Sequence, residues 1–165
     1  MTEYKLNKEQ KLEQSYIYLA NTILNLNNNN NSKFICVTSS MENRMDKYLI
    51  AKNICNQIRK NGKNVLLLNV DTHYEKCDIS NDMDINGMSS KKLKKVFDDN
   101  RDKYDIVLIN VPSVRLFANT IECAKLCDGT IIVERYLYTK YKDFEDTILR
   151  LKENNIKIYG LITYR

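Results

Sequence analysis

Glycine, proline, histidine and tryptophan are scarce in this sequence, which contains four, one, one and none of them respectively. A lone histidine, His73, cannot build a catalytic triad or a His-rich metal site. The five cysteines form no Cys-x-x-Cys pair, and their odd number argues against a closed set of disulfides. We therefore expect no metal site and no disulfide partner, with the cysteines acting as small hydrophobic residues in a reducing cytoplasm.

Long hydrophobic runs are also missing. No apolar stretch approaches the roughly 18–20 residues that a membrane-spanning helix needs. The amino-terminal residues are largely charged or polar, unlike those of a secretory signal. At 165 residues the chain has room for one ordinary domain. We expect a single cytoplasmic domain over residues 1–165.

The charge is mildly basic and not concentrated. The net charge of +5 comes from 26 basic and 21 acidic residues. The densest basic group, within residues 91–95, alternates with apolar residues at helical spacing and is typical of a solvated helix face. Without a basic patch, we expect no nucleic-acid partner.

Hydrophobic patterning predicts alternating helices and strands. A helix is expected at about residues 7–26, followed by an Asn-rich linker at 27–32. Gly62 stands where a helix would end in a left-handed residue. Five short apolar runs are expected to be strands: 33–38, 64–70, 105–111, 130–134 and 157–163. Helices are expected between them, at about 46–60, 91–100, 119–126 and 143–154.

Continuous apolar strands separated by amphipathic helices indicate an α/β fold, with a doubly wound, mostly parallel sheet flanked by helices. Ligands of such sheets bind at the carboxyl ends of the strands. Candidate site residues therefore lie in the segments 38–47, 69–73, 110–115 and 134–140. Three tyrosines in or directly after the last of these segments, Tyr136, Tyr138 and Tyr141, are expected to lie exposed at a partner interface rather than to accept phosphate.

The segment after the first strand carries a family resemblance. It reads Val37-Thr38-Ser39-Ser40, and Lys47 follows at the start of a helix. Further segments agree in order and spacing: 62–71 (GKNVLLLNVD), 104–113 (YDIVLINVPS) and 127–135 (CDGTIIVER). Together they resemble the bacterial capsule and exopolysaccharide tyrosine kinases (BY-kinases), relatives of the Min/Par-type P-loop ATPases.

This resemblance implies positions for a nucleotide and its metal, but the chain departs from the family at most of them. The implied nucleotide-binding residues are Ser39, Ser40, Lys47, Tyr48 and Asp71. None of the glycines lies in the loop that would wrap phosphates, and Tyr48 replaces the hydroxyl that would hold Mg²⁺.

Two further departures affect the metal. The resemblance places Walker A′ residues at Asn69 and Asp71 and the Walker B residue at Asn110. A neutral amide cannot balance a divalent cation as a carboxylate does. We therefore expect no cofactor, with ATP and Mg²⁺ as the alternative. Lys47 is either a phosphate ligand or an ordinary lysine at a helix start, and Asp71 either a metal-side residue or a turn cap.

The sequence-based hypothesis is thus a catalytically degenerate, tyrosine-kinase-like protein that acts by protein contact in the regulation of capsular or exopolysaccharide biosynthesis. The alternative is an ATP-binding protein with residual nucleotide binding or kinase activity. The partner implied by the resemblance is a membrane-anchored polysaccharide chain-length regulator or an active paralogue, which would hold the protein at the inner face of the membrane. The family's ring-forming residues of the first helix correspond to Gln14, Ile17 and Ala20, so a ring is not expected.

Overall fold

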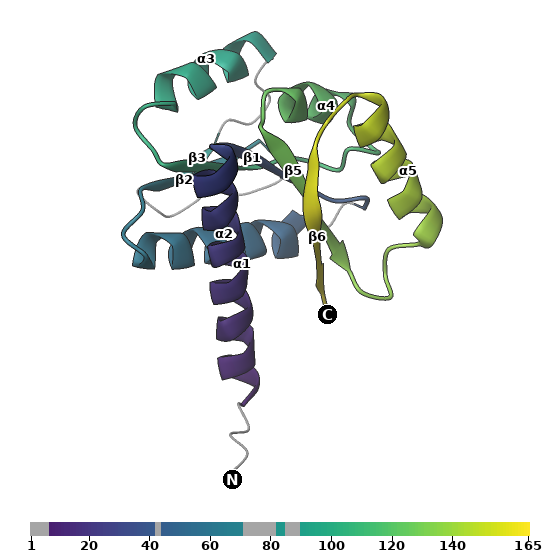
Figure 1. Ribbon diagram of the computed structural model, residues 1–165. Helices are drawn as coiled ribbons and strands as arrows, with labels where there is room; N and C mark the ends of the chain where they lie inside the picture. Colours follow the sequence, from purple (N-terminus) through teal and green to yellow (C-terminus); the bar gives the residue numbers. More distant parts are fainter. Residues whose placement is uncertain (1–6, 42–43, 71–81, 85–89) are drawn as a thin grey trace.

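The protein is described by a computed structural model in which residues 7–41, 44–70, 82–84 and 90–165 are placed (Figure 1). Helices and strands largely alternate along the chain, as the hydrophobic pattern predicts. The helices are α1 (Lys8–Asn30), α2 (Arg44–Lys60), α3 (Ser90–Asn100), α4 (Ala118–Lys125) and α5 (Tyr141–Glu153). The strands are β1 (Phe34–Thr38), β2 (Val65–Asn69), β3 (Asp82–Asp84), β4 (Ile106–Asn110), β5 (Gly129–Arg135) and β6 (Ile158–Tyr164).

The strands form one sheet in the order β3-β2-β4-β1-β5-β6, and every neighbouring pair is parallel. The predicted doubly wound α/β fold is therefore confirmed. The strand β3 was not predicted, because three residues reading Asp-Met-Asp give no hydrophobic signal. The order places β1 at the centre of the sheet, so the loop that follows it opens at the middle of the carboxyl edge.

Alternate residues of the central strands pack into two hydrophobic layers, one on each face of the sheet. On one face, Ile35 and Val37 pack with residues of α1 and α2. On the other, Phe34 and Cys36 pack with residues of α3, α4 and α5. Burying both faces explains why these strands are continuously apolar, and it leaves the strand ends as the place for polar chemistry.

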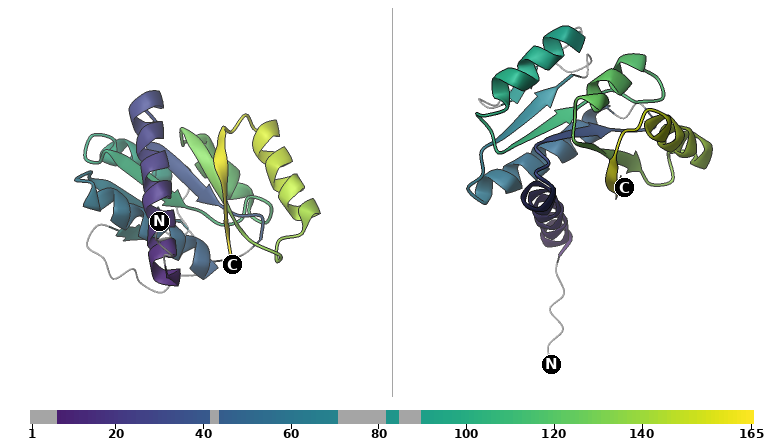
Figure 2. Two further views of the ribbon diagram at one scale, coloured as in Figure 1. Left: turned by 60° about the horizontal axis from the view of Figure 1, so that its bottom comes forward. Right: turned by 45° about the horizontal axis from the view of Figure 1, so that its top comes forward.

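The first helix is longer than predicted. Residues 27–30, expected in the Asn-rich linker, complete α1, and the helix ends at Asn31, which has a left-handed φ of 52°. The side chain of Asn27 donates hydrogen bonds to the carbonyl oxygens of Ser32 (3.1 Å) and Asp105 (3.2 Å). The linker prediction was wrong because these contacts hold the Asn tract in helical form. The amino-terminal turns of α1 are exposed and extend past the rest of the domain (Figure 2).

The second helix ends as the sequence predicts. Gly62 has a φ of +76°, and its N–H donates to the carbonyl oxygen of Arg59 over 2.9 Å. The described cysteines are reduced: Cys36, Cys55 and Cys123 are buried, and burial raises the pKa of the Cys127 thiol. The three buried cysteines therefore fill the core as small apolar side chains.

Candidate functional site

The carboxyl ends of β1, β2, β4 and β5 meet at one edge of the sheet, where the loop after β1 leads into α2. Within this loop, Ser39 and Ser40 are buried. The Ser39 hydroxyl donates a hydrogen bond of 2.6 Å to the carbonyl oxygen of Met41. Both serines thus lie at the expected place, but Ser39 is bonded within the loop.

The backbone N–H and carbonyl oxygen of Ser40 both form hydrogen bonds within the protein. Its N–H donates to Oε1 of Glu134, at the end of β5, over 2.6 Å. Its carbonyl oxygen accepts from the Ser113 hydroxyl (2.9 Å) and from Nε of Arg115 (3.3 Å). In a P-loop such a backbone N–H would face a phosphate. Here a protein carboxylate takes that hydrogen bond.

Glu134 is the first residue of the candidate segment 134–140, but the sequence did not single it out as a site residue. It is 6% exposed, and its second carboxylate oxygen accepts a 2.6 Å hydrogen bond from the Thr139 hydroxyl. An acidic residue directly after the apolar run 131–133 was the available sequence signal. Both oxygens of this carboxylate therefore have protein donors.

Lys47 lies in the first turns of α2 and is 1% exposed. Its ammonium group donates a hydrogen bond to the carbonyl oxygen of Val111, just after β4. Burial and this bond direct the charge into the protein between the ends of β1 and β4. Lys47 is therefore buried and hydrogen-bonded within the protein, whereas a solvated lysine at a helix start would extend into water.

Asn69 and Asn110 lie side by side at the ends of β2 and β4, where the strand register pairs them. Both are fully buried, and Nδ2 of Asn110 donates to Oδ1 of Asn69 over 2.7 Å. The other amide atoms, Nδ2 of Asn69 and Oδ1 of Asn110, have no hydrogen-bond partner. The two residues at the implied metal-side positions thus form a neutral amide pair.

Tyr48, at the position implied for a metal-binding hydroxyl, lies in the hydrophobic layer of α1 and α2 and is 5% exposed. Its side chain contributes to the core, and its implied part in nucleotide binding stays a prediction. Asp46, two residues before Tyr48, accepts a 3.1 Å hydrogen bond from the Tyr164 hydroxyl. Burial, with a further effect of the Asp46 carboxylate, raises the pKa of Tyr164, so this phenol stays protonated and donates.

The described residues at this edge do not fit Mg²⁺. The amide pair is uncharged, Tyr48 is in the core, and the Glu134 carboxylate is already bonded. Asp71 and His73 lie outside the described residues. Among the residues that are described, no group of three or more His, Cys, Asp or Glu could hold a metal ion.

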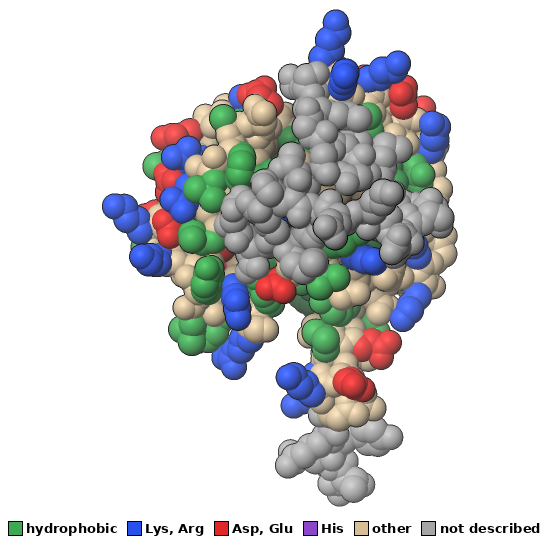
Figure 3. Space-filling view, turned by 180° about the vertical axis from the view of Figure 1, so that it is seen from behind, with side chains coloured by type: hydrophobic (Ala, Val, Ile, Leu, Met, Phe, Trp, Pro, Cys, Tyr) green, Lys and Arg blue, Asp and Glu red, His purple; other side chains and the backbone are tan. Residues whose placement is uncertain are grey.

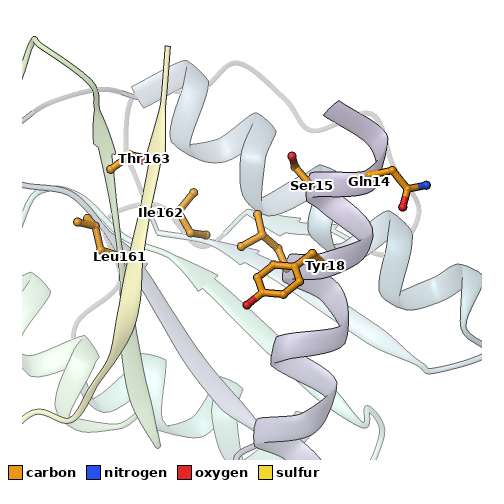
Figure 4. Close-up of a pocket in the computed structure, with 7 residues that line it drawn as sticks. Gln14, Ser15, Tyr18, Leu161, Ile162 and Thr163 are labelled. Atoms are coloured by element: carbon orange, nitrogen blue, oxygen red, sulfur yellow. The ribbon is translucent and has the colours of Figure 1, made fainter. Parts of the chain in front are cut away.

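A separate open groove of about 450 Å³ lies between α1 and β6 (Figure 4). Tyr18 points from α1 toward the strand, and none of the lining side chains is charged. The groove is therefore no phosphate site. Of the implied ring residues on α1, Gln14 lines this groove and Ala20 is buried in the core. The lining residues are Gln14, Ser15, Tyr18, Leu19, Leu161, Ile162 and Thr163.

Comparison with known proteins supports the resemblance. No protein-family model matches the chain. Tyrosine-protein kinase ptk from Acinetobacter johnsonii is 27% identical over 75 residues, which is 46% of this chain and 10% of that protein. The BceF tyrosine kinase domain superposes with a TM-score of 0.76 at 17% identity, covering 92% of this chain and 76% of that one.

Two further solved structures agree. The kinase domain of Escherichia coli tyrosine kinase ETK has a TM-score of 0.73 at 13% identity, with 89% of this chain and 73% of that one covered. MinD from Aquifex aeolicus has a TM-score of 0.66 at 18% identity, with 81% and 70% covered. The chain has the P-loop fold of the bacterial tyrosine kinase domains, and the resemblance to these kinases is confirmed. At such identities the structural likeness shows the fold and leaves activity to the site.

No helix in the described part of the chain is long and apolar enough to cross a membrane. Basic and acidic side chains are intermingled on the described part of the face seen in Figure 3.

Proposed function

We propose that this chain is a catalytically degenerate, BY-kinase-like domain that acts by protein contact in the regulation of capsular or exopolysaccharide biosynthesis. The observation that carries the loss of catalysis is the buried Asn69–Asn110 pair, bonded at 2.7 Å. Phosphoryl transfer depends almost wholly on positioning and on neutralising the phosphate charge through metal ions. Two buried amides supply no charge for the metal.

The loop at the end of β1 supports the same proposal. The carboxylate of Glu134 occupies the N–H of Ser40, and a phosphate entering there would have to displace it and would meet its negative charge. Lost donors of this kind each cost on the order of 10²–10³ in rate. Losing the phosphate cradle together with the metal-side carboxylates leaves little catalysis to expect.

The biological part of the proposal follows from the resemblance. A domain of this fold that no longer turns over ATP can still occupy the place of a kinase domain on a kinase's partner. The proposed partner is a membrane-anchored polysaccharide chain-length regulator or an active paralogue. Such a partner would also bring the domain to the inner face of the membrane.

Titration calorimetry tests this proposal. We expect no heat with ATP or ADP, with or without Mg²⁺, at protein concentrations sensitive to a Kd of about 1 mM. The cytoplasmic segment of a chain-length regulator is expected to give heat in the same cell, and the ETK kinase domain serves as the positive control for nucleotide. Nucleotide binding that strengthens with Mg²⁺ would contradict the proposal.

A second candidate is a nucleotide-binding protein that does not use a metal. Two buried donors near the loop favour it, since Oγ of Ser40 and Nδ2 of Asn69 have no hydrogen-bond partner. Lys47 adds a positive charge at the same edge. In this alternative, a phosphate would take the place of the Glu134 carboxylate.

The variant Glu134→Ala separates the two candidates. Removing the carboxylate leaves the buried N–H of Ser40 and the Thr139 hydroxyl without their acceptor, so we expect a loss of about 2 kcal/mol in unfolding free energy. For a degenerate domain, ATP binding stays undetected in calorimetry. Glu134→Gln keeps an acceptor oxygen and is the matched control. ATP binding that appears only in Glu134→Ala would favour the nucleotide-binding candidate.

A further inference from the structure

Residues 135–142 run from the last residue of β5 through the connecting loop into the first turn of α5, and they expose several large apolar side chains. Leu137 is 89% exposed, and it is flanked by Tyr136 (48%), Tyr138 (56%) and Tyr141 (78%). We call residues 135–142 the tyrosine loop. Large apolar side chains gathered at one exposed turn point to an interaction surface.

The backbone holds Leu137 in this exposed position. Its φ is 60°, a left-handed value that is uncommon for any residue except glycine, asparagine or aspartate. The turn is closed by hydrogen bonds from the N–H groups of Tyr138 and Thr139 to the carbonyl oxygen of Arg135, at 3.2 and 3.3 Å. A leucine is thus fixed where an asparagine would be less strained and better solvated, which indicates that its apolar side chain has a use.

The charge around the tyrosine loop is positive. Residues 135–142 include Arg135, Lys140 and Lys142 and no acidic residue. Arg165 adds a fourth cation, because its guanidinium lies 4.6 Å from the centre of the Tyr136 ring. Seen from behind, hydrophobic and basic side chains lie beside one another at the lower left of the molecule, the side on which this loop lies (Figure 3).

The nearest acidic groups do not offset this charge. The Glu134 carboxylate is buried against Ser40 and Thr139. Asp143 forms an ion pair with Arg115, with 3.5 Å between Oδ1 and NH1. Residues 135–142 therefore place three cations, with Arg165 as a fourth, beside an exposed leucine and three tyrosines. A complementary partner would be anionic and able to accept apolar groups.

We propose that the tyrosine loop binds an anionic lipid surface, with Leu137 inserted below the headgroups, the tyrosines at the interface and the four cations on the lipid phosphates. A lipid surface is favoured over an acidic peptide because Leu137 projects from the molecule and is not part of a groove. This inference is independent of the proposed function, since it needs neither nucleotide nor a protein partner.

The chain has no tryptophan, so a single introduced tryptophan reports on the loop alone. We expect Tyr138→Trp to show a blue-shifted emission on adding vesicles of equimolar phosphatidylcholine and phosphatidylglycerol, and little shift with phosphatidylcholine alone. Tyr18→Trp, at a tyrosine that is 72% exposed on α1, is the matched probe and is expected to stay unshifted. No shift with the anionic vesicles would overturn the proposal.

Vesicle co-sedimentation measures the part played by Leu137. Leu137→Asn suits the left-handed backbone, so the variant should fold, and we expect it to bind the anionic vesicles at least about tenfold more weakly. Leu149→Asn, at a leucine 52% exposed on α5, is the control and should bind like the original chain. Lys140→Gln should weaken binding about fivefold.

Two outcomes would overturn the assignment to lipid. In one, Leu137→Asn and Leu149→Asn bind the vesicles equally well, so that insertion of Leu137 plays no part. In the other, soluble polyglutamate shifts the emission of the Tyr138→Trp variant as vesicles were expected to, and the loop would then be a site for an acidic protein segment.

Discussion

Gly129→Ala is expected to lower the free energy of unfolding by about 2–3 kcal/mol, because β5 begins where there is no room for a side chain. A Cβ at this position would lie 2.4 Å from Cε2 and 2.5 Å from Cζ of Tyr159. The ring cannot easily retreat. Its hydroxyl donates to the carbonyl oxygen of Asp128 (2.9 Å) and lies 2.5 Å from the Ser32 hydroxyl.

Gly160→Ala is the matched control, since a Cβ there meets no heavy atom within 4 Å. We expect this variant to stay within about 0.5 kcal/mol of the original chain. Urea unfolding followed by circular dichroism measures both variants. Equal stability of the two would show that the Tyr159 ring moves aside and that its two hydrogen bonds do not fix it.

Contacts of Asp128 and Gly129 explain, in terms of folding, why the segment 127–135 resembles the family. Oδ2 of Asp128 accepts hydrogen bonds from the N–H groups of Lys33 (2.7 Å) and Phe34 (2.8 Å), where β1 begins. Asp128 and Gly129 therefore join β1, β5 and β6 at the amino-terminal edge of the sheet, away from the loop edge. This segment supports the fold and gives no support for catalysis.

The fold could be predicted from the sequence where local pattern and tertiary packing agree. The runs at 33–38, 64–70 and 105–111 are buried on both faces, so their composition alone marks them as strands. β3 was not predicted because its three residues are mostly polar and too few to form an apolar run. The end of α1 was predicted wrongly because the Asn27 side chain donates a hydrogen bond to the carbonyl oxygen of Asp105, 78 residues away.

The location of the site could be predicted from the sequence, but the hydrogen bonds within it could not. Lys47, Asn69 and Asn110 were placed at the carboxyl edge by the motif spacing, and they lie there. The bond between Glu134 and Ser40 joins residues 94 apart in the chain, and sequence periodicity carries no information on such a pair. Nor could the spacing show that the Tyr48 side chain enters the core.

The variant Asn110→Asp restores the carboxylate that the family resemblance implies, and we expect it to destabilise the fold without restoring ATPase activity. The position is fully buried and faces Oδ1 of Asn69. A buried carboxylate is costly unless donors surround it, and a rotated Asn69 amide could supply one. We expect a loss of about 3 kcal/mol in unfolding free energy at pH 7.

The pH dependence identifies the buried charge as the cause. Burial raises the pKa of the new carboxyl in the folded state above its unfolded value of about 3.9. The protonated form is tolerated at low pH, so the penalty develops as the pH rises and levels off above the folded-state pKa. Between the two pKa values it changes by about 1.4 kcal/mol per pH unit. Asn110→Leu, which loses the amide pair but adds no charge, should show no such slope.

Adding Mg²⁺ to the Asn110→Asp variant distinguishes a metal site that has been lost from one that a single carboxylate restores. If the described residues at this edge cannot complete a site, adding Mg²⁺ should neither recover the stability of Asn110→Asp in urea unfolding nor produce phosphate release from ATP. The Ser40 N–H would still be held by Glu134 and the Tyr48 side chain would still lie in the core, so one carboxylate restores neither the phosphate cradle nor the metal hydroxyl. Stabilisation by Mg²⁺, or measurable turnover in this single variant, would mean that the edge still assembles a metal site and that the domain is closer to a working kinase than its amide pair indicates.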